Sequence, residues 1–379
     1  MKIIHFSDTH LGYGEYSRVD PASGINQREL DVNAAFKQAI DIILKKKPDL
    51  VIHAGDLFDS PRPSNRAIHT ALFELQRLSN AGIPTVLISG NHSTPRVAAS
   101  CSIFEAITIL PNMHPVYKKQ YEKIIIGDAA VHVVPHTSSD TELCAELDKV
   151  KKDAKVKYNI LGLHAGITWD DVYKMGEFNE LIIPGKVLSK LKGFDYIALG
   201  HWHKFLPLEK IPNAHYSGST ERFSFREAGY PKGIVFVDLA EHKAELIPIE
   251  VREMIKLGPL NCSGKTATEV LEMINKLKEK SKIDGRIIQL KLENLARSTY
   301  VQLDLKHIRE LFIEAFHVDI HPELVSEEEG GSAVEKPIDA LPLEFERFLA
   351  GIKMPEKEKK EFVNLGTRYI NQAQEKEQL

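Results

Sequence analysis

Five short apolar runs constrain the fold of this 379-residue chain more than any other feature, and each ends in side chains that commonly bind metal ions. The central run, Val51–Ser60 (VIHAGDLFDS), begins with β-branched residues and delivers Asp56 where a buried strand would meet its loop. The other four runs end in the same way: IIHFSDTH with Asp8 and His10, VLISGNH with Asn91 and His92, ILGLH with His164, and YIALGHWH with His201 and His203. Since parallel sheets present ligand sites at the carboxyl ends of their strands, we expect all five to converge.

Helical patterns alternate with these runs over residues 1–250, which predicts an α/β domain with a sheet covered by helices. Apolar spacing predicts helices at 32–46 and 64–80, a hairpin at 123–135 and a polar surface helix at 142–157. The pattern changes after Pro248. Residues 259–325 read as a small α+β domain, with a capping box at Thr266 and Glu269, a half-exposed strand in IIQLKLEN, a helix at 305–316 and a strand at 318–321.

Residues 326–336, which contain EEEGGS, are expected to form a linker, and residues 337–379 an amphipathic helix pair. The apolar stripes of this pair include Phe345, Phe348, Leu349, Phe362 and Tyr369. They predict either packing on the chain's own body or docking of a partner.

Composition excludes several classes of protein. The net charge of -4 gives no overall basic footprint, so nucleic-acid binding would require local patches. The three cysteines show no CxxC spacing, which argues against a disulfide framework or a zinc knuckle. No run approaches the ~18 apolar residues of a membrane span. We therefore expect a cytoplasmic protein that does not enter membranes.

The ligand types indicate a site for two metal ions. Asp8 and His10 are two residues apart and face the same side of extended backbone, and His201 and His203 repeat this spacing. The Asp56 carboxylate could bridge two cations. With Asn91 and His164 the set has seven nitrogen and oxygen donors and no thiolate, which suits Mn, Fe or Zn.

Two cations suit phosphodiester hydrolysis, because they neutralise the anionic oxygens and lower the pKa of a bound water. His92, beside the ligand Asn91, is the natural general acid for the leaving oxygen. Singly, each residue has an ordinary structural explanation, such as a helix cap, a turn or a buried histidine. The order of the five motifs along the strands favours the metal site.

The order DTH, GD, GNH, H and GHWH over residues 1–237 resembles the calcineurin-like metallophosphoesterases. Within them the chain is most similar to SbcD-type (meiotic-recombination nuclease family) double-strand-break repair nucleases, through FSDTHLGY, GDLFDSPRPS and YSGSTERFSFREAGYPKG. The resemblance implies a two-sheet β-sandwich flanked by helices, a DNA-binding capping domain and a C-terminal helix pair. It places Asp8, His10, Asp56 and His203 on one ion and Asp56, Asn91, His164 and His201 on the other.

The resemblance further implies two Mn²⁺ ions, with other divalent metals possible, and DNA ends, hairpins and single strands as substrates. These would be cut by 3′ to 5′ exonuclease and single-strand endonuclease activity. It implies docking of an SbcC-type SMC-like ATPase on the C-terminal stripes. It also implies a homodimer through Ile68, Leu72 and Phe104, although these three could equally be core residues. Loop arginines are candidates for phosphate contacts: Arg18, Arg62, Arg66, Arg96 and Arg222.

Two positions depart from the family pattern. Ser93 stands where the family typically has Asp after GNH; a hydroxyl can orient His92 but cannot stabilise an imidazolium as a carboxylate does. Asp59 stands where archaeal members often have His after DLF. Two alternatives therefore stay open: a phosphodiesterase for small nucleotides, and a weakly catalytic scaffold that brings DNA ends to the ATPase.

Overall fold

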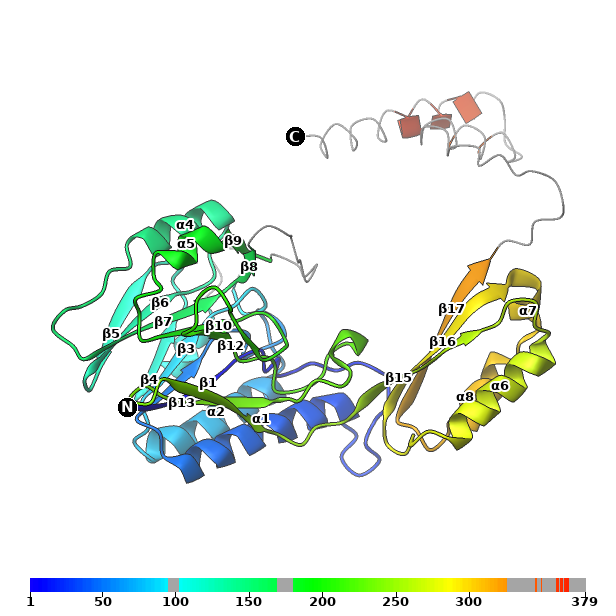
Figure 1. Ribbon diagram of the computed structural model, residues 1–379, viewed down its shortest axis with the longest axis horizontal. Helices are drawn as coiled ribbons and strands as arrows, with labels where there is room; N and C mark the ends of the chain where they lie inside the picture. Colours follow the sequence, from blue (N-terminus) through cyan, green and yellow to red (C-terminus); the bar gives the residue numbers. More distant parts are fainter. Residues whose placement is uncertain are drawn as a thin grey trace.

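Two six-stranded sheets stacked face to face form the body of the protein (Figure 1). The computed structural model describes residues 1–94, 102–168 and 180–325, with Phe345, Leu349 and residues 359–360, 362–363 and 365–367. The first sheet has the order β14-β13-β1-β2-β3-β4, and its strands are β1 (Lys2–Phe6), β2 (Leu50–His53), β3 (Thr85–Ile88), β4 (Met113–Val116), β13 (Gly233–Asp238) and β14 (Lys243–Pro248). The second has the order β11-β12-β10-β7-β6-β5, and its strands are β5 (Glu122–Ile126), β6 (Ala129–Val134), β7 (Tyr158–His164), β10 (Tyr196–Gly200), β11 (Leu206–Pro207) and β12 (Ala214–Tyr216).

Helices cover the outer face of each sheet, which confirms the expected sandwich. Helices α1 (Gln27–Lys46) and α2 (Asn65–Asn80) pack on the first sheet, and the short α3 (Phe104–Ile107) joins their core. Helices α4 (Asp140–Asp148) and α5 (Gly185–Ser189) cover the second sheet, next to the small sheet of β8 (Gly166–Thr168) and β9 (Ile182–Pro184). Between the sheets, side chains such as Ile52, Ile88 and Ile160 are fully buried. Strand β2 is buried on both faces, which explains its unbroken apolar sequence.

Strand direction brings the motif residues to one edge. Strands β1, β2 and β3 run parallel in the first sheet, and β7 and β10 run parallel in the second, with His164 opposite Gly200. Every motif therefore lies at or just beyond the carboxyl end of its strand, where the two sheets meet.

The expected and observed helices differ mainly at their ends. Helix α1 begins at Gln27 and not at residue 32, because the Asn26 side chain accepts the N–H of Arg28 and extends the helix over a polar first turn. Helix α4 is capped by Ser139 and ends at Asp148, well short of residue 157. The expected helix at 305–316 ends at Leu311 in α8. The hairpin at 123–135 is confirmed as the antiparallel pair β5–β6.

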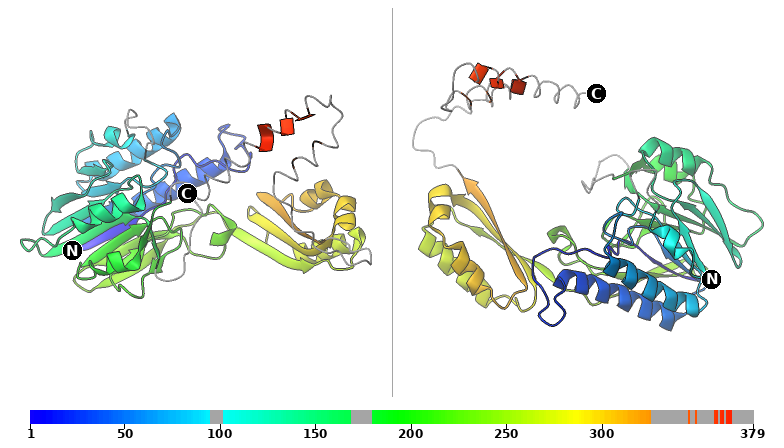
Figure 2. Two further views of the ribbon diagram at one scale, coloured as in Figure 1. Left: turned by 90° about the horizontal axis from the view of Figure 1, so that it is seen from above. Right: turned by 180° about the vertical axis from the view of Figure 1, so that it is seen from behind.

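The small domain is a three-stranded parallel sheet with helices on one face (Figure 2). Its elements are β15 (Met254–Asn261), α6 (Ala267–Glu279), β16 (Ile287–Ala296), α7 (Arg297–Gln302), α8 (Leu305–Leu311) and β17 (His317–Val325). The expected capping box of Thr266 and Glu269 is present at the start of α6. The sheet starts at Met254, ahead of the expected boundary at residue 259.

Two arginines hold this domain to the body. Arg18 Nη1 donates to the carbonyls of Ala315 and Phe316 at 3.1 and 2.8 Å. Arg252 makes a two-pronged ion pair with Asp31 of α1, and its guanidinium lies 4.3 Å from the centre of the Phe316 ring. The Phe316 ring thus lies beside two cations at the junction.

The described residues of the C-terminal part are helical. A Cβ placed on Gly366 would lie 2.1 Å from the Phe345 ring, so this ring packs directly on the Gly366 backbone. Leu349 is buried, whereas Phe362 and Leu365 are about half exposed. Over the described ranges, no helix combines the length and apolar character needed to cross a bilayer.

Candidate metal centre

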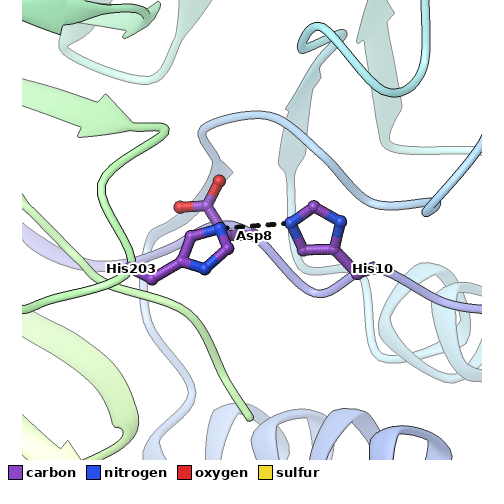
Figure 3. Close-up of side chains that lie close together, drawn as sticks. All are labelled: Asp8, His10 and His203. Carbon is purple, nitrogen blue, oxygen red and sulfur yellow. Dashed lines mark hydrogen bonds between the residues drawn. The ribbon is translucent and has the colours of Figure 1, made fainter. Parts of the chain in front are cut away.

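Ligand atoms from four motifs meet in two overlapping buried groups. Donor atoms of Asp8, His10 and His203 lie within 4.8 Å of one another, and so do those of Asp8, Asp56 and His164. Figure 3 shows the His10 and His203 rings facing each other beside the Asp8 carboxylate. Their Nε2 atoms are 3.3 Å apart.

An outer carboxylate fixes the orientation of each of these two rings. His10 Nδ1 lies 3.1 Å from Asp59 Oδ1, and His203 Nδ1 lies 3.3 Å from Glu227 Oε1. Because a carboxylate accepts the Nδ1 proton, each neutral ring directs the lone pair of its Nε2 at the other ring. Two facing lone pairs repel unless a cation or a proton lies between them. This arrangement fits a divalent cation held by both nitrogens and the Asp8 carboxylate.

The second group is arranged around Asp56. His164 Nδ1 donates to the Ala54 carbonyl at 2.8 Å, which leaves Nε2 at 2.9 Å from Asn91 Oδ1 and 3.1 Å from Asp56 Oδ2. Asp56 Oδ2 is buried, and apart from its ion-pair contact with His164 it has no hydrogen-bond partner among the described residues. Such an oxygen fits a site in which a cation supplies the missing interaction.

His201, which belongs to neither of these two groups, lies next to them on the side of the second sheet. Its ring lies 5.4 Å from the His164 ring. Its backbone N–H donates to both Asp8 carboxylate oxygens at 3.1 Å. Its Nε2 is 3.0 Å from Glu180 Oε1. Each of the four ligand histidines therefore has an outer partner, and for three of them it is a carboxylate.

Opposite charges inside the group shift its pKa values. Although burial alone raises the pKa of Asp56, the neighbouring His164, His92 and His10 hold it well below its ordinary value. Burial lowers the pKa of His164, but the Asp56 and Asp8 carboxylates outweigh it and raise the value to about 9. The Asp56 carboxylate therefore stays ionised and favours positive charge beside it.

Four ligand residues adopt left-handed backbone conformations. The φ angles are 51° at Asp8, 50° at His10, 52° at Asp56 and 105° at His201. Non-glycine residues rarely adopt such angles, which cost about 1–3 kcal/mol each and cluster at functional sites. The sequence pattern does not reveal these backbone conformations.

Three glycines that precede ligands leave the space that the neighbouring ligands occupy. A Cβ on Gly55 would lie 2.0 Å from His164 Nδ1, and one on Gly90 would lie 2.3 Å from Asp56 Oδ1. At Gly200 it would lie 2.0 Å from the Ala54 carbonyl oxygen and 2.9 Å from His164 Nδ1. The glycine in each of GD, GNH and GHWH is thus required by packing between motifs.

Sequence reasoning missed a buried ion pair behind His203. Glu227, 5% exposed, accepts from His203 Nδ1, the N–H of Ser224 and the ammonium group of Lys232. Lys232, 2% exposed, also donates to the His203 carbonyl at 2.6 Å. Although burial raises the pKa of Glu227, His203 and Lys232 hold it well below its ordinary value. The only sequence signal was the S-x-x-E capping box at the start of the short helix η1 (Phe225–Glu227).

His92 lies at the rim of the same site. Its backbone N–H donates to Asp56 Oδ1 at 2.9 Å, and its ring Nδ1 lies 3.0 Å from the Asp59 carbonyl oxygen. Its ring is 4.8 Å from that of His10. The Asp59 backbone therefore orients this imidazole. Ser93 is fully buried, and its Oγ has no hydrogen-bond partner among the described residues.

The candidate arginines occupy different environments. Arg18 donates to carbonyls of the small domain, and Arg222 donates to the carbonyls of Arg252 and Tyr230. Arg66 pairs with Glu29 at 2.9 Å and is about half exposed, and Arg62 is exposed. Arg96 lies outside the described residues.

The candidate contact residues also differ. Phe104 is fully buried in the core beside the first sheet, whereas Ile68 and Leu72 on α2 are partly buried next to the exposed Phe73. Of the C-terminal candidates, Phe345, Leu349 and Phe362 are described, and Phe348 and Tyr369 lie outside the described residues.

Comparisons with known proteins identify the family to which the chain belongs. Residues 1–205 match the calcineurin-like phosphoesterase family. The chain is 29% identical to the DNA double-strand break repair protein Mre11 of Methanocaldococcus jannaschii over 316 residues, 76% of each chain. It is 28% identical to the Mre11 protein of Methanococcus maripaludis over 74% of this chain and 76% of that one, and 28% identical to that of Sulfolobus acidocaldarius over 84% and 82%.

Proposed function

Because the chain belongs to the calcineurin-like phosphoesterase family and is thereby a metal-dependent phosphodiesterase, we propose that it is a Mn²⁺-dependent DNA nuclease that processes double-strand breaks. The observation that carries the proposal is the buried set of carboxylates and histidines at the joined sheet edges. The named role of its relatives in double-strand break repair supports DNA as the substrate. The proposed activities are 3′ to 5′ exonuclease and endonuclease cleavage of single strands and hairpins.

We assign Asp8, His10, Asp56 and His203 to one cation, and Asp56, Asn91, His164 and His201 to the other, with Asp56 between them. The grouping of Asp8 with His10 and His203, and of Asp56 with His164 and Asn91, supports this assignment. Two bound divalent cations would neutralise the phosphodiester oxygens and lower the pKa of a water molecule. Asp59, Glu227 and Glu180 keep the ligand rings in one orientation, so little reorganisation is needed when substrate binds.

We assign proton transfer to His92. Its Nδ1 proton is held by the Asp59 carbonyl, so Nε2 is the atom that exchanges a proton with the leaving oxygen. We expect His92→Gln to keep Mn²⁺ and DNA binding while the cleavage rate falls by about 10²–10⁴-fold. Calorimetry for Mn²⁺ and gel assays on duplex ends and hairpins measure these quantities.

The same assay distinguishes the alternatives. Unchanged cleavage in His92→Gln would rule out His92 as the acid. Hydrolysis of cyclic nucleotides by the wild type, with DNA left intact, would favour the small-nucleotide phosphodiesterase. DNA binding without cleavage by the wild type would favour the scaffold.

We further propose that the C-terminal helix pair docks an SbcC-type ATPase. Phe362 and Leu365 leave a half-exposed apolar face, while Phe345 and Leu349 stabilise the pair from within. Phe362→Glu is expected to abolish co-purification with the ATPase while nuclease activity survives. Retained co-purification would indicate that the docking surface lies elsewhere.

Homodimer formation and a cytoplasmic location complete the proposal. Ile68 and Leu72 lie near the exposed Phe73 on α2, so Leu72→Glu should shift the mass in solution from dimer to monomer. A wild-type mass of one chain would contradict a dimer. Cell fractionation tests the location.

A further inference from the structure

A cavity of about 350 Å³ lies directly beside the metal-ligand groups and shares His203 with them. One wall comes from the GHWH turn and the start of β11, with Trp202, Lys204 and Leu206. The other comes from η1 and the residues around it, with Arg226 and Tyr230. The volume falls within the range of about 300–1,000 Å³ that small-ligand sites occupy.

Trp202 forms a rigid aromatic wall of this cavity. Its ring stacks on that of Tyr216, with centroids 4.6 Å apart and planes 17° apart. Tyr216 is fully buried, and its hydroxyl donates to the Ala165 carbonyl at 2.8 Å. Because the second sheet holds Trp202 from behind, a planar ligand that stacks on Trp202 would order few side chains on binding.

The opposite wall pairs an aromatic ring with positive charge. Tyr230 is 37% exposed, and the Lys204 ammonium lies 4.2 Å from its ring centre. Arg226 is exposed on the same wall. The one acidic wall residue, Glu227, is neutralised by its ion pair with Lys232. The cavity thus offers aromatic surface inside and cations around it.

We propose that this cavity holds a nucleobase of a DNA strand whose neighbouring phosphate lies at the metal centre. This inference rests on the proposed nuclease function and names a subsite within it. Trp202 and Tyr230 stack on the base, and Lys204 and Arg226 lie against the backbone phosphates. The combination of aromatic platforms and a cationic rim is how proteins bind single strands without reading their sequence.

Trp202 provides a direct readout of binding. The chain has two tryptophans, Trp169 and Trp202, so Trp169→Phe leaves Trp202 as the sole tryptophan, whose emission can be excited selectively over that of the tyrosines. We expect a short single-stranded dT oligonucleotide, added in chelator so that no cleavage occurs, to change the Trp202 emission. An abasic oligonucleotide of the same length should bind more weakly and leave the emission unchanged.

Variants separate base stacking from phosphate contact. We expect Tyr230→Ala to weaken dT binding about 10-fold and abasic binding less than about 2-fold, because stacking on one aromatic contributes about 1–3 kcal/mol. Lys204→Ala should weaken both oligonucleotides equally. Lys155→Ala is the matched control, since Lys155 is exposed at the other end of the second sheet, just before β7. It should change neither affinity.

Two outcomes would overturn the inference. One is unchanged Trp202 emission at saturating dT, with binding shown by fluorescence anisotropy. The other is an equal loss for dT and abasic oligonucleotides in Tyr230→Ala. If the wild type still cleaves DNA in either case, the cavity assignment fails and the nuclease proposal stands. If the wild type neither binds nor cleaves DNA, the proposed function itself fails. Thermal melting of each variant establishes that it is folded.

Discussion

Replacing Glu227 with Gln tests whether the ion pair behind His203 serves the metal centre, the fold, or both. The substitution keeps the shape of the side chain and removes its charge. It leaves the Lys232 ammonium, 2% exposed, with only neutral acceptors, the His203 carbonyl and the Ser219 hydroxyl. Removing one partner of a buried ion pair costs about 3–5 kcal/mol of unfolding free energy. We expect this loss in urea unfolding with chelator present.

Metal affinity should fall through a separate route. The Glu227 carboxylate accepts the Nδ1 proton of His203 and raises the electron density at Nε2. Loss of such an outer partner typically lowers metal affinity by about 10–100-fold. Titration calorimetry of Mn²⁺ into the metal-free protein measures the change. Glu245→Gln breaks an exposed pair with Lys243 and is the matched control, for which Mn²⁺ affinity should not change.

The double variant Glu227→Gln/Lys232→Met distinguishes the two effects. It removes both buried charges, so most of the stability should return, while Mn²⁺ affinity should stay low because His203 still lacks its carboxylate. Wild-type Mn²⁺ affinity in Glu227→Gln would refute the outer-partner role. Recovery of affinity in the double variant would show that the unpaired Lys232 caused the loss.

Three further predictions address the glycines, acid stability and the domain junction. Gly90→Ala should abolish tight Mn²⁺ binding, because its Cβ would displace Asp56, whereas Gly193→Ala, which faces open space, should not; equal affinities would contradict the packing argument. Burial lowers the pKa of His5 to about 3, so the unfolded chain binds more protons between pH 6.5 and 3, and stability falls as pH drops through this window. His5→Phe should reduce that slope in chelator by up to about 1.4 kcal/mol per pH unit, and an unchanged slope would refute the assignment. Arg18→Ala removes two charge-assisted hydrogen bonds, each of about 1.5–3 kcal/mol, so amides of β17 should exchange hydrogen at least about 10-fold faster; unchanged exchange would show that Arg252 holds the junction alone.

The convergence of the candidate metal ligands was predictable, because the sequence shows where buried strands end. An apolar run that stops at a glycine marks both the end of a buried strand and the place where a polar side chain can emerge. Asp56 after β2 and His201 after β10 both follow this rule. The order of the motifs then implied their convergence, since parallel strands bring their carboxyl ends together.

The outer partners were not predictable, because each comes from a distant part of the chain. Asp59 contacts His10 across 49 positions, Glu227 contacts His203 across 24, and Glu180 contacts His201 across 21. Asp59 stood out in the sequence only as a departure from the family pattern, yet its carboxylate orients one ligand and its carbonyl orients His92. Side chains that act through another residue carry no local pattern, so only the three-dimensional structure identifies them.

The three crowded glycines give a rule for reading the sequences of relatives. Gly55, Gly90 and Gly200 bind nothing, yet any side chain there would overlap a ligand or its support. A relative that keeps all seven ligand types but carries a larger residue at one of these positions is expected to have lost the centre. Such a loss would be hard to reverse, because the ligand residues, once without function, would be substituted before the glycine was restored. An inactive descendant can thus be recognised by what fills the space next to its ligands.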